Sequence, residues 1–214
     1  QTGARFGYLT EAANTVGAQC VGALPQAGGL NARQMVQGVL KAAVLLQVEP
    51  QWDCAAGEAG QQGLQSAQTV ITLSPFKANL DISDVLLPVA PFTETSGTFV
   101  NAEGRVQSFH AVVKPLGETR PAWKVLRVLA NLLELPGFDY ESSQDVLTAA
   151  IGAETKEVPS ALRSNITKVA AKVPENEAAE PVTASIYQLD GIVRRATSLQ
   201  LTADARLARE GGAA

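Results

Sequence analysis

Two apolar runs within one short stretch decide the fold: residues 69–89 read TVITLSPFKANLDISDVLLPV. The runs lie at 69–73 and 85–89, and a third, AVLLQV, precedes them at 43–48. All three have the length of a strand and are largely continuous rather than alternating, which is typical of a parallel sheet covered on both faces. The pattern therefore predicts an α/β fold, with an antiparallel sheet that has a buried centre as the alternative.

Helices are predicted around these strands. The clearest is 121–134, where Pro121 occupies the first helical position and the apolar residues form one stripe. Further elements are expected as helices at 32–40, 57–67, 144–151, 160–171 and 187–199, a helical turn at 79–83 and a short strand at 4–9. Residues 10–30 are predicted to be a loop with one helical turn, because glycines interrupt any amphipathic pattern. Residues 172–184 are predicted to be an exposed loop, and the polar tail from Thr202 to fray.

A β-hairpin is predicted at 96–110, after the third apolar run. Its strands are 98–100 and 106–109, and the tetrapeptide NAEG joins them. Asn101 at the first position of this tetrapeptide and Gly104 at the fourth suit a type I turn. The hairpin is therefore expected to be a tight local unit.

The chain is expected to contain two regions. The first, residues 1–150, is an α/β domain that includes the hairpin, and the second, residues 151–214, is a helical extension that includes the exposed loop. The sequence begins at Gln1, almost directly in an expected strand. We therefore expect it to be an internal piece of a larger protein.

Composition argues against several kinds of partner. The 214 residues carry a net charge of −4 with scattered Lys and Arg, whereas nucleic acids and anionic membrane surfaces bind clustered basic residues. The longest apolar run has the length of a strand, far short of the roughly 20 residues that span a bilayer. We expect a protein of the cytosol with no nucleic-acid partner and no direct membrane insertion.

The sequence is poor in residues that carry chemistry. His110 is the one histidine, which removes most nucleophile–base triads and multi-histidine metal sites, and a structural role is expected for it. Cys20 and Cys54 are far apart, too few for an iron–sulfur cluster, and are expected to be small buried or half-buried residues. No glycine-rich phosphate loop is present. We assign no catalytic, cofactor-binding or metal-binding residue.

Two groups of charged residues remain as weaker candidates. Asp81 and Asp84 follow the second predicted strand, and ligands of open sheets lie beyond the carboxyl ends of strands. The alternative, which we favour, is that they cap a helical turn before the third strand. Glu94, Glu103 and Arg105 are placed to form an ion-pair cluster around the hairpin, and such clusters are more often structural than catalytic.

Residues 74–107, SPFKANLDISDVLLPVAPFTETSGTFVNAEGRVQ, resemble the molybdopterin oxidoreductase superfamily. Its members carry an ADVVLP-like strand, then Glu-x-x-Gly-Thr, then Asn-x-Glu-Gly-Arg-x-Gln. The strand matches 84–88, and the motif residues here are Glu94, Gly97, Thr98, Asn101, Glu103, Gly104, Arg105 and Gln107. The resemblance implies a Rossmann-like parallel sheet flanked by helices, with an appended β-hairpin and C-terminal helices.

Within that superfamily the sequence looks most like the large iron–sulfur subunit of bacterial NADH-quinone oxidoreductase, respiratory complex I. The likeness extends through 11–25, 42–50 and, more loosely, 187–205. It leaves residues 152–185 without a counterpart. The motif supports the superfamily, and these flanking segments support the choice of subunit.

The resemblance implies that this segment has a structural role and catalyses no reaction itself. The subunit holds its iron–sulfur clusters in an N-terminal part that lies outside this sequence, and this segment contributes no cofactor. Catalytic relatives bind a molybdenum–bis(pterin) cofactor, which the complex I subunit looks to have lost. The segment would then be a scaffold for electron transfer from NADH to quinone.

This scaffold would contact the rest of its subunit and other subunits of the peripheral arm, on the cytoplasmic side of the bacterial inner membrane. Two alternatives stay open. One is a fragment of an active molybdopterin enzyme such as a formate dehydrogenase. The other is a free-standing ligand-binding α/β domain.

Overall fold

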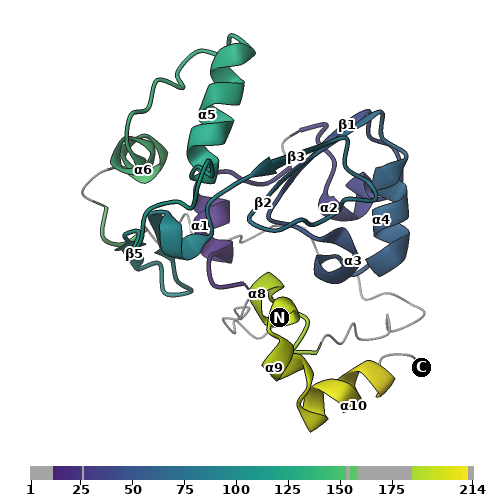
Figure 1. Ribbon diagram of the computed structural model, residues 1–214. Coiled ribbons are helices and arrows are strands. Elements are labelled where there is room, and N and C mark those ends of the chain that lie inside the picture. Colours follow the sequence, from purple (N-terminus) through teal and green to yellow (C-terminus); the bar gives the residue numbers. More distant parts are fainter. Residues whose placement is uncertain (1–11, 26, 153–154, 159–184, 212–214) are drawn as a thin grey trace, which may run out of the picture. The chain divides into compact units, whose positions relative to one another are not determined.

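The structure is a computed structural model, and it describes residues 12–25, 27–152, 155–158 and 185–211 (Figure 1). The predicted strand at 4–9, helix at 160–171 and loop at 172–184 therefore lie outside the described residues. Within these residues a parallel sheet with flanking helices, together with a separate antiparallel hairpin, confirms the α/β class.

The chain folds as two compact units that interleave along the sequence. The hairpin unit comprises Gln1–Asn31, Ser74–Phe76 and Pro88–Ala170, and the sheet unit comprises Ala32–Leu73, Lys77–Leu87 and Ala171–Ala214. This division differs from the linear one predicted at residue 150. The reason is that the last helices of the chain return to the sheet unit, where ion pairs hold them.

The predicted parallel sheet is present, with the strand order β1-β2-β3. Its strands are β1 Ala42–Leu46, β2 Thr69–Ser74 and β3 Val85–Pro88. Strands β1 and β2 pair in parallel, with Ala42 opposite Thr69. On the other side of β2, the Asp84 N–H donates to the Val70 carbonyl at 2.9 Å, beside the start of β3. All three apolar runs of the sequence therefore became strands of one sheet.

Helices cover one face of this sheet. They are α2 Ala32–Met35, α3 Pro50–Asp53 and α4 Gly57–Gln65. The core beneath them contains Ala43, Leu45, Leu64, Val70 and Ile82. Burial of these side chains is the main stabilising contribution of the sheet unit.

The prediction that both faces of the sheet are covered was wrong for β1. Its residues alternate between exposed and buried, and Val44 and Leu46 are 50% and 41% exposed while Ala43 and Leu45 are buried. The physical reason is that Ala43 and Leu45 face the core beneath the helices, whereas the described part of the chain leaves Val44 and Leu46 on the other face largely uncovered.

Glycines in α4 let the chain pack closely against this helix. A Cβ atom on Gly63 would lie 2.8 Å from the carbonyl carbon of Val36 and 3.2 Å from the Gly38 nitrogen. Gly38 has φ +79°, a left-handed conformation that suits glycine. These constraints end α2 at Met35, so the helix predicted over 32–40 is only four residues long.

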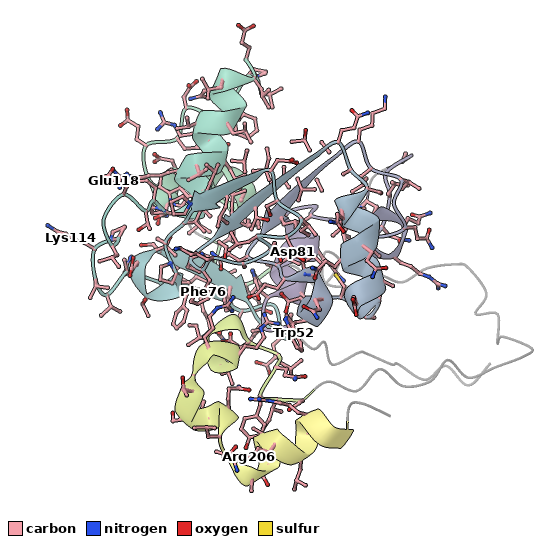
Figure 2. All side chains as sticks on the ribbon, turned by 45° about the vertical axis from the view of Figure 1, so that its right-hand side comes forward. Trp52, Phe76, Asp81, Lys114, Glu118 and Arg206 are labelled. Atoms are coloured by element: carbon pink, nitrogen blue, oxygen red, sulfur yellow. The ribbon has the colours of Figure 1, made fainter. Side chains whose placement is uncertain are left out.

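The acidic residues before β3 both accept structural hydrogen bonds. The Asp84 carboxylate accepts a hydrogen bond from the Val70 N–H at 2.7 Å, near the start of β2. Asp81 accepts one from the Gln61 side chain of α4 (Figure 2). Asp84 therefore lies at the amino edge of the sheet rather than at the carboxyl ends of the strands, because the loop returns there before β3 begins. The predicted helical turn at 79–83 is a hydrogen-bonded turn in which the Ser83 N–H donates to the Asn79 carbonyl.

Replacing Asp84 by alanine is expected to lower the free energy of unfolding by about 1–3 kcal/mol, because the buried Val70 N–H then loses its acceptor. Urea unfolding followed by circular dichroism measures the change. Asp81→Ala is the matched control, since both aspartates are exposed but Asp81 accepts from a side chain rather than from a buried N–H, and a shift within about 0.5 kcal/mol is expected. Equal losses from the two variants would contradict this role of Asp84.

Three short helices close the sheet unit: α8 Gly191–Arg195, α9 Thr197–Gln200 and α10 Ala203–Gly211. The single helix predicted over 187–199 is interrupted at Ala196, which has an extended ψ of 93°. The Gln200 side chain compensates, because its amide donates to the carbonyls of Tyr187 and Val193.

The prediction that the tail from Thr202 frays was also wrong for the part that the structure describes, which forms α10. Ala205 is only 1% exposed, and its N–H donates to the Thr202 hydroxyl at 3.3 Å. The Arg209 guanidinium then donates to the carbonyl and side-chain oxygens of Gln200, at 3.1 and 2.7 Å. These contacts to α9 hold a helix that its polar sequence alone does not indicate.

The hairpin unit contains the predicted hairpin and helices. Its elements are α1 Thr15–Cys20, the short 3₁₀ helix η1 Phe92–Glu94, β4 Gly97–Val100, β5 Val106–Phe109, α5 Ala122–Leu132 and α6 Ser143–Ile151. Pro121 is the N-cap of α5 rather than its first helical residue. Residues 10–30, predicted to be mostly loop, contain the six residues of α1.

Candidate functional site

The family-like motif forms the antiparallel hairpin β4–β5. Gly97 pairs with Phe109 and Thr98 with Ser108, and the hydroxyls of this second pair lie 3.0 Å apart. A Cβ atom on Gly97 would come within 2.7 Å of the Phe109 ring, so glycine is required for this close approach. Phe109 also packs edge to face on Phe99, with ring centroids 5.6 Å apart. Gly97 and Thr98 therefore serve the packing of the hairpin itself.

The turn of the hairpin uses the Asn and Gly of the motif as predicted. The Gly104 N–H donates to the Asn101 carbonyl at 2.9 Å, and Gly104 has φ +86°. The Asn101 side-chain oxygen accepts from the Glu103 and Arg105 N–H groups at 3.1 and 2.9 Å. One asparagine side chain thus satisfies two amides that the tight turn leaves without strand partners.

A short segment after α6 pairs with the hairpin on its far side. The Val158 N–H donates to the Gly104 carbonyl at 2.8 Å, and the Val106 N–H donates to the Lys156 carbonyl at 2.9 Å. Val158 is 2% exposed, and Glu157 forms an antiparallel bridge with Arg105. Nothing local in the sequence indicated this pairing, because the segment had no counterpart in the resemblance.

Glu94 is held by backbone rather than by a cation. Its carboxylate accepts a hydrogen bond from the Leu116 N–H at 2.9 Å. This contact joins η1 to the loop that precedes α5. We predicted that Glu94 would join an ion-pair cluster with Glu103 and Arg105. Its carboxylate instead makes a hydrogen bond that fixes the loop.

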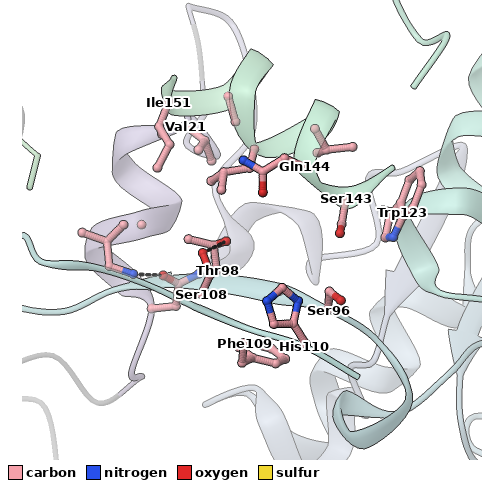
Figure 3. A pocket seen from close by; sticks show the side chains of 17 residues that line it. Val21, Ser96, Thr98, Ser108, Phe109, His110, Trp123, Ser143, Gln144 and Ile151 are labelled. Carbon is pink, nitrogen blue, oxygen red and sulfur yellow. Dashed lines mark hydrogen bonds between the residues drawn. The ribbon is translucent and has the colours of Figure 1, made fainter. Parts of the chain in front are cut away.

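A half-open cavity of about 250 Å³ lies beside the hairpin, within the hairpin unit (Figure 3). Its walls are formed by α1, the β4–β5 hairpin and α6, with Trp123 of α5 at the side. Asn14, the N-cap of α1, fixes α1 to the hairpin because its side-chain oxygen accepts from the Val100 N–H at 2.8 Å. Gly17 makes room for the Asn14 side chain, whose Cγ would be 2.8 Å from an added Cβ atom.

Polar side chains gather at one end of the cavity. Figure 3 shows Ser143 and Gln144 of α6 above His110 and Ser96, with Trp123 at the side. The remaining wall is largely apolar and includes Val21, Val146, Leu147 and Ile151. The sequence reasoning gave His110 a structural role and missed the other four residues, because no motif connects the start of α6 with a strand end that lies far away in the sequence.

The start of α6, where Ser143 and Gln144 lie, is fixed by a capping box. The Ser142 hydroxyl accepts from the Asp145 N–H at 3.1 Å, and the Asp145 carboxylate accepts from the Ser142 N–H at 2.8 Å. It also accepts from the Glu141 N–H at 3.0 Å. These hydrogen bonds hold the pKa of Asp145 below its usual value, the Ser142 N–H contributing most.

This capping box is expected to weaken in acid. Because the folded-state pKa of Asp145 is lowered, its stabilising contribution is present above the unfolded pKa of about 3.9 and is lost as the pH falls through the folded-state value. NMR titration of the Asp145 carboxyl group should give a midpoint below about 3.9. In Ser142→Ala the midpoint should rise and α6 should become less stable, because the helix loses its cap. An unshifted midpoint in both proteins would contradict this assignment.

The part of the chain that the structure describes contains no group of three or more His, Cys, Asp or Glu side chains placed to hold a metal ion. No helix within it is long and apolar enough to cross a membrane. Cys20 and Cys54 are free thiols and are half-buried, as predicted. Burial, and then the charge of Asp53, raises the pKa of the Cys54 thiol.

Comparison with known proteins identifies the family. The model of the molybdopterin oxidoreductase family matches residues 2–132, more than half of the chain. The chain belongs to the molybdopterin oxidoreductase family. This confirms the superfamily inferred from residues 74–107.

Two relatives of this family member are informative. A putative formate dehydrogenase of Staphylococcus aureus (strain bovine RF122 / ET3-1) is 47% identical over 58 residues, which are 27% of the chain and 6% of the relative. The probable oxidoreductase YjgC of Bacillus subtilis is 40% identical over 70 residues, which are 33% of the chain and 7% of the relative. One is named a putative formate dehydrogenase and the other a probable oxidoreductase, and neither name is that of a complex I subunit. The aligned part of the chain spans less than a tenth of either relative.

The cavity does not fit the molybdenum–bis(pterin) cofactor that the resemblance implies for catalytic members. Its volume of about 250 Å³ is below the roughly 300–1,000 Å³ of pockets for drug-sized ligands, and a two-pterin cofactor is larger than those. None of the 17 residues drawn around it is Lys or Arg, the side chains that pair with phosphate groups. This cavity of the molybdopterin oxidoreductase-family chain is therefore not a site for that cofactor.

Proposed function

We propose that this chain is a scaffold segment of the large iron–sulfur subunit of an NADH-quinone oxidoreductase. The observation that carries the proposal is the use of the motif's polar groups inside the hairpin unit. The side chains of Asn101, Thr98 and Glu94 all make hydrogen bonds to the hairpin or its neighbouring loop. Because these polar groups already hydrogen-bond within the unit, we infer that they maintain its structure in a larger subunit and do not react with a substrate.

The proposal also says where in the larger complex this segment would lie. The iron–sulfur clusters would be held by another part of the same subunit, and electrons would pass from NADH to quinone through that part. The segment would contact the rest of its subunit and other peripheral-arm subunits, on the cytoplasmic side of a bacterial inner membrane. The resemblance of 11–25 and 42–50 to the complex I subunit supports this choice.

A second candidate is a fragment of an active formate dehydrogenase-like molybdenum enzyme. The names of the relatives at 40–47% identity favour it. In that protein this segment would be part of the framework, and the molybdenum ligand would come from elsewhere in the polypeptide. The two candidates share the framework role of the hairpin and differ in whether the whole protein binds molybdenum.

The full-length protein that contains this chain distinguishes the candidates. After purification, molybdenum is measured by mass spectrometry, released pterin by fluorescence, and NADH:quinone and formate oxidation by spectrophotometry. The scaffold proposal expects iron, no molybdenum or pterin, and activity only with NADH in the assembled complex. Stoichiometric molybdenum together with formate oxidation would refute it and establish the second candidate.

A further inference from the structure

The cavity of the hairpin unit has the composition of a binding site for a small molecule. One part of its wall is apolar, formed by Val21 of α1 and by Val146, Leu147 and Ile151 of α6. Polar groups also line it, among them His110 at the end of β5 and Gln144 in the first turn of α6, and both residues are exposed. Apolar walls with a few polar groups at one end are characteristic of small-molecule pockets.

The polar end is firmly positioned. The capping box of Ser142 and Asp145 fixes the first turn of α6, and the pairing of β4 with β5 fixes the strand that leads into His110. The hydrogen bond between Asn14 and the Val100 N–H anchors α1 on the other side. The groups that would contact a ligand are thus held in place before it binds, which reduces the entropy lost on binding.

The lining selects an uncharged ligand. Among the residues described around the cavity there is no Asp, Glu, Lys or Arg. A charged group that entered the apolar part would lose water without gaining a partner. The amide of Gln144 and the ring of His110 offer both hydrogen-bond donors and acceptors to a neutral polar group.

The volume limits the ligand to about two fused rings. A cavity of about 250 Å³ lies just below the range for drug-sized ligands. A bicyclic aromatic body would fill the space between α1 and α6 and leave its one polar substituent at Gln144 and His110.

We propose that this cavity binds a small, uncharged, one- or two-ring molecule with a polar group, such as a carboxamide or a carbonyl, at one end. The ring lies against Val146, Leu147 and Ile151, and the polar group exchanges hydrogen bonds with Gln144 and His110. The inference concerns this chain's own cavity and does not depend on whether the whole protein holds molybdenum.

Three matched probes test the ligand class on the full 214-residue chain. They are 2-naphthamide, its charged counterpart 2-naphthoate, and naphthalene, which lacks the polar end. Saturation-transfer NMR or equilibrium dialysis is expected to give 2-naphthamide a dissociation constant on the order of 1 mM, typical of so small a ligand. The naphthoate should bind more weakly, because its carboxylate accepts but cannot donate hydrogen bonds and meets no cation in the lining. Naphthalene should bind about fivefold more weakly, because it lacks the hydrogen bonds.

Two neighbouring alanines of α6 provide a matched pair of variants for the location. Ala150 lines the cavity and its neighbour Ala149 does not, although both are exposed. Ala150→Trp should block the cavity and abolish naphthamide binding, and Ala149→Trp should leave binding within about twofold, as for surface changes. Gln144→Leu should weaken naphthamide about fivefold and naphthalene little, because it removes one hydrogen-bonding group.

The binding measurements either support or overturn the proposed ligand site. The expected order of the three probes, with loss of binding only in Ala150→Trp, supports the proposal. It is overturned if 2-naphthamide does not bind, if naphthoate binds as well as naphthamide, or if both tryptophan variants weaken binding equally. Circular dichroism spectra that match those of the unchanged chain verify that both variants fold.

Discussion

Replacing Gly104 by valine is expected to lower the free energy of unfolding of the hairpin unit by about 2–4 kcal/mol. A left-handed backbone costs a residue with a Cβ atom about 1–2 kcal/mol, and valine is among the least suited to it. Gly104 has φ +86° and is buried, and its carbonyl accepts the Val158 N–H. A change at the turn therefore also releases the segment 156–158. Denaturant unfolding and hydrogen exchange at Val158 measure the effect.

Two controls separate the causes of this loss. Gly117→Val introduces the same side chain at φ +56°, where nothing lies within 4 Å of an added Cβ atom, so about 1–2 kcal/mol of backbone strain alone is expected. Glu103→Gln keeps the turn and should change stability by less than about 0.5 kcal/mol. If Gly104→Val unfolds at the same denaturant concentration as the unchanged chain, the proposed turn conformation is wrong.

Replacing Arg194 by alanine is expected to release the C-terminal helices from the sheet unit. The Arg194 guanidinium contacts Asp53 at 2.9 Å and Glu49 at 3.5 Å, and its side chain is only 10% exposed. Glu49 also pairs with Arg195 at 2.8 Å. Removing Arg194 leaves partly buried carboxylates with fewer cations, which we expect to cost about 2–4 kcal/mol.

The readout is hydrogen exchange over residues 191–195 together with urea unfolding. Arg194→Lys is expected to recover only part of the loss, because an ammonium cannot bridge two carboxylates as a guanidinium does. Arg120→Ala is the matched control, because Arg120 pairs with Glu118 on the surface, where the side chains are 54% and 94% exposed (Figure 2). Its expected effect is below about 1 kcal/mol. Equal effects of Arg194→Ala and Arg120→Ala would show that the buried cluster does not hold α8.

The parts of the fold that were predicted correctly have local causes. The runs at 43–48, 69–73 and 85–89 became strands because each is apolar and short. The NAEG turn followed from the preferences of asparagine and glycine. Helix α6 begins after Ser142 and ends before Gly152, two residues that favour those positions.

The motif also indicated the correct superfamily, while the choice of a particular subunit stays a prediction. The family match confirms the ancestry seen in residues 74–107. The choice of the complex I subunit rested on flanking segments, and the names of the relatives point to formate dehydrogenase-like proteins instead. The motif residues turned out to stabilise a hairpin, so they indicate ancestry more strongly than activity.

Several errors share a physical cause, which is contact with a neighbouring element, between residues 9 and 14 positions apart in the two cases below. Helix α10 forms although its sequence is polar, because Arg209 binds Gln200 and Ala205 is buried. Asp84 lies at the amino edge of the sheet because the loop before β3 folds back onto β2. No local pattern contains these partners.

By itself the sequence determined the strands, the hairpin turn, the caps of α6 and the family of this protein, because short-range preferences and a compact motif encode them. The tertiary structure alone decided how these elements are joined. Glu49 and Arg195 meet although 146 residues separate them, and Val100 meets Asn14 across 86. The cavity arises in the same way, since α1, the hairpin and α6 enclose it only after folding. Side chains that are far apart in sequence become a candidate site when packing brings them together, and hydrophobic burial drives that packing.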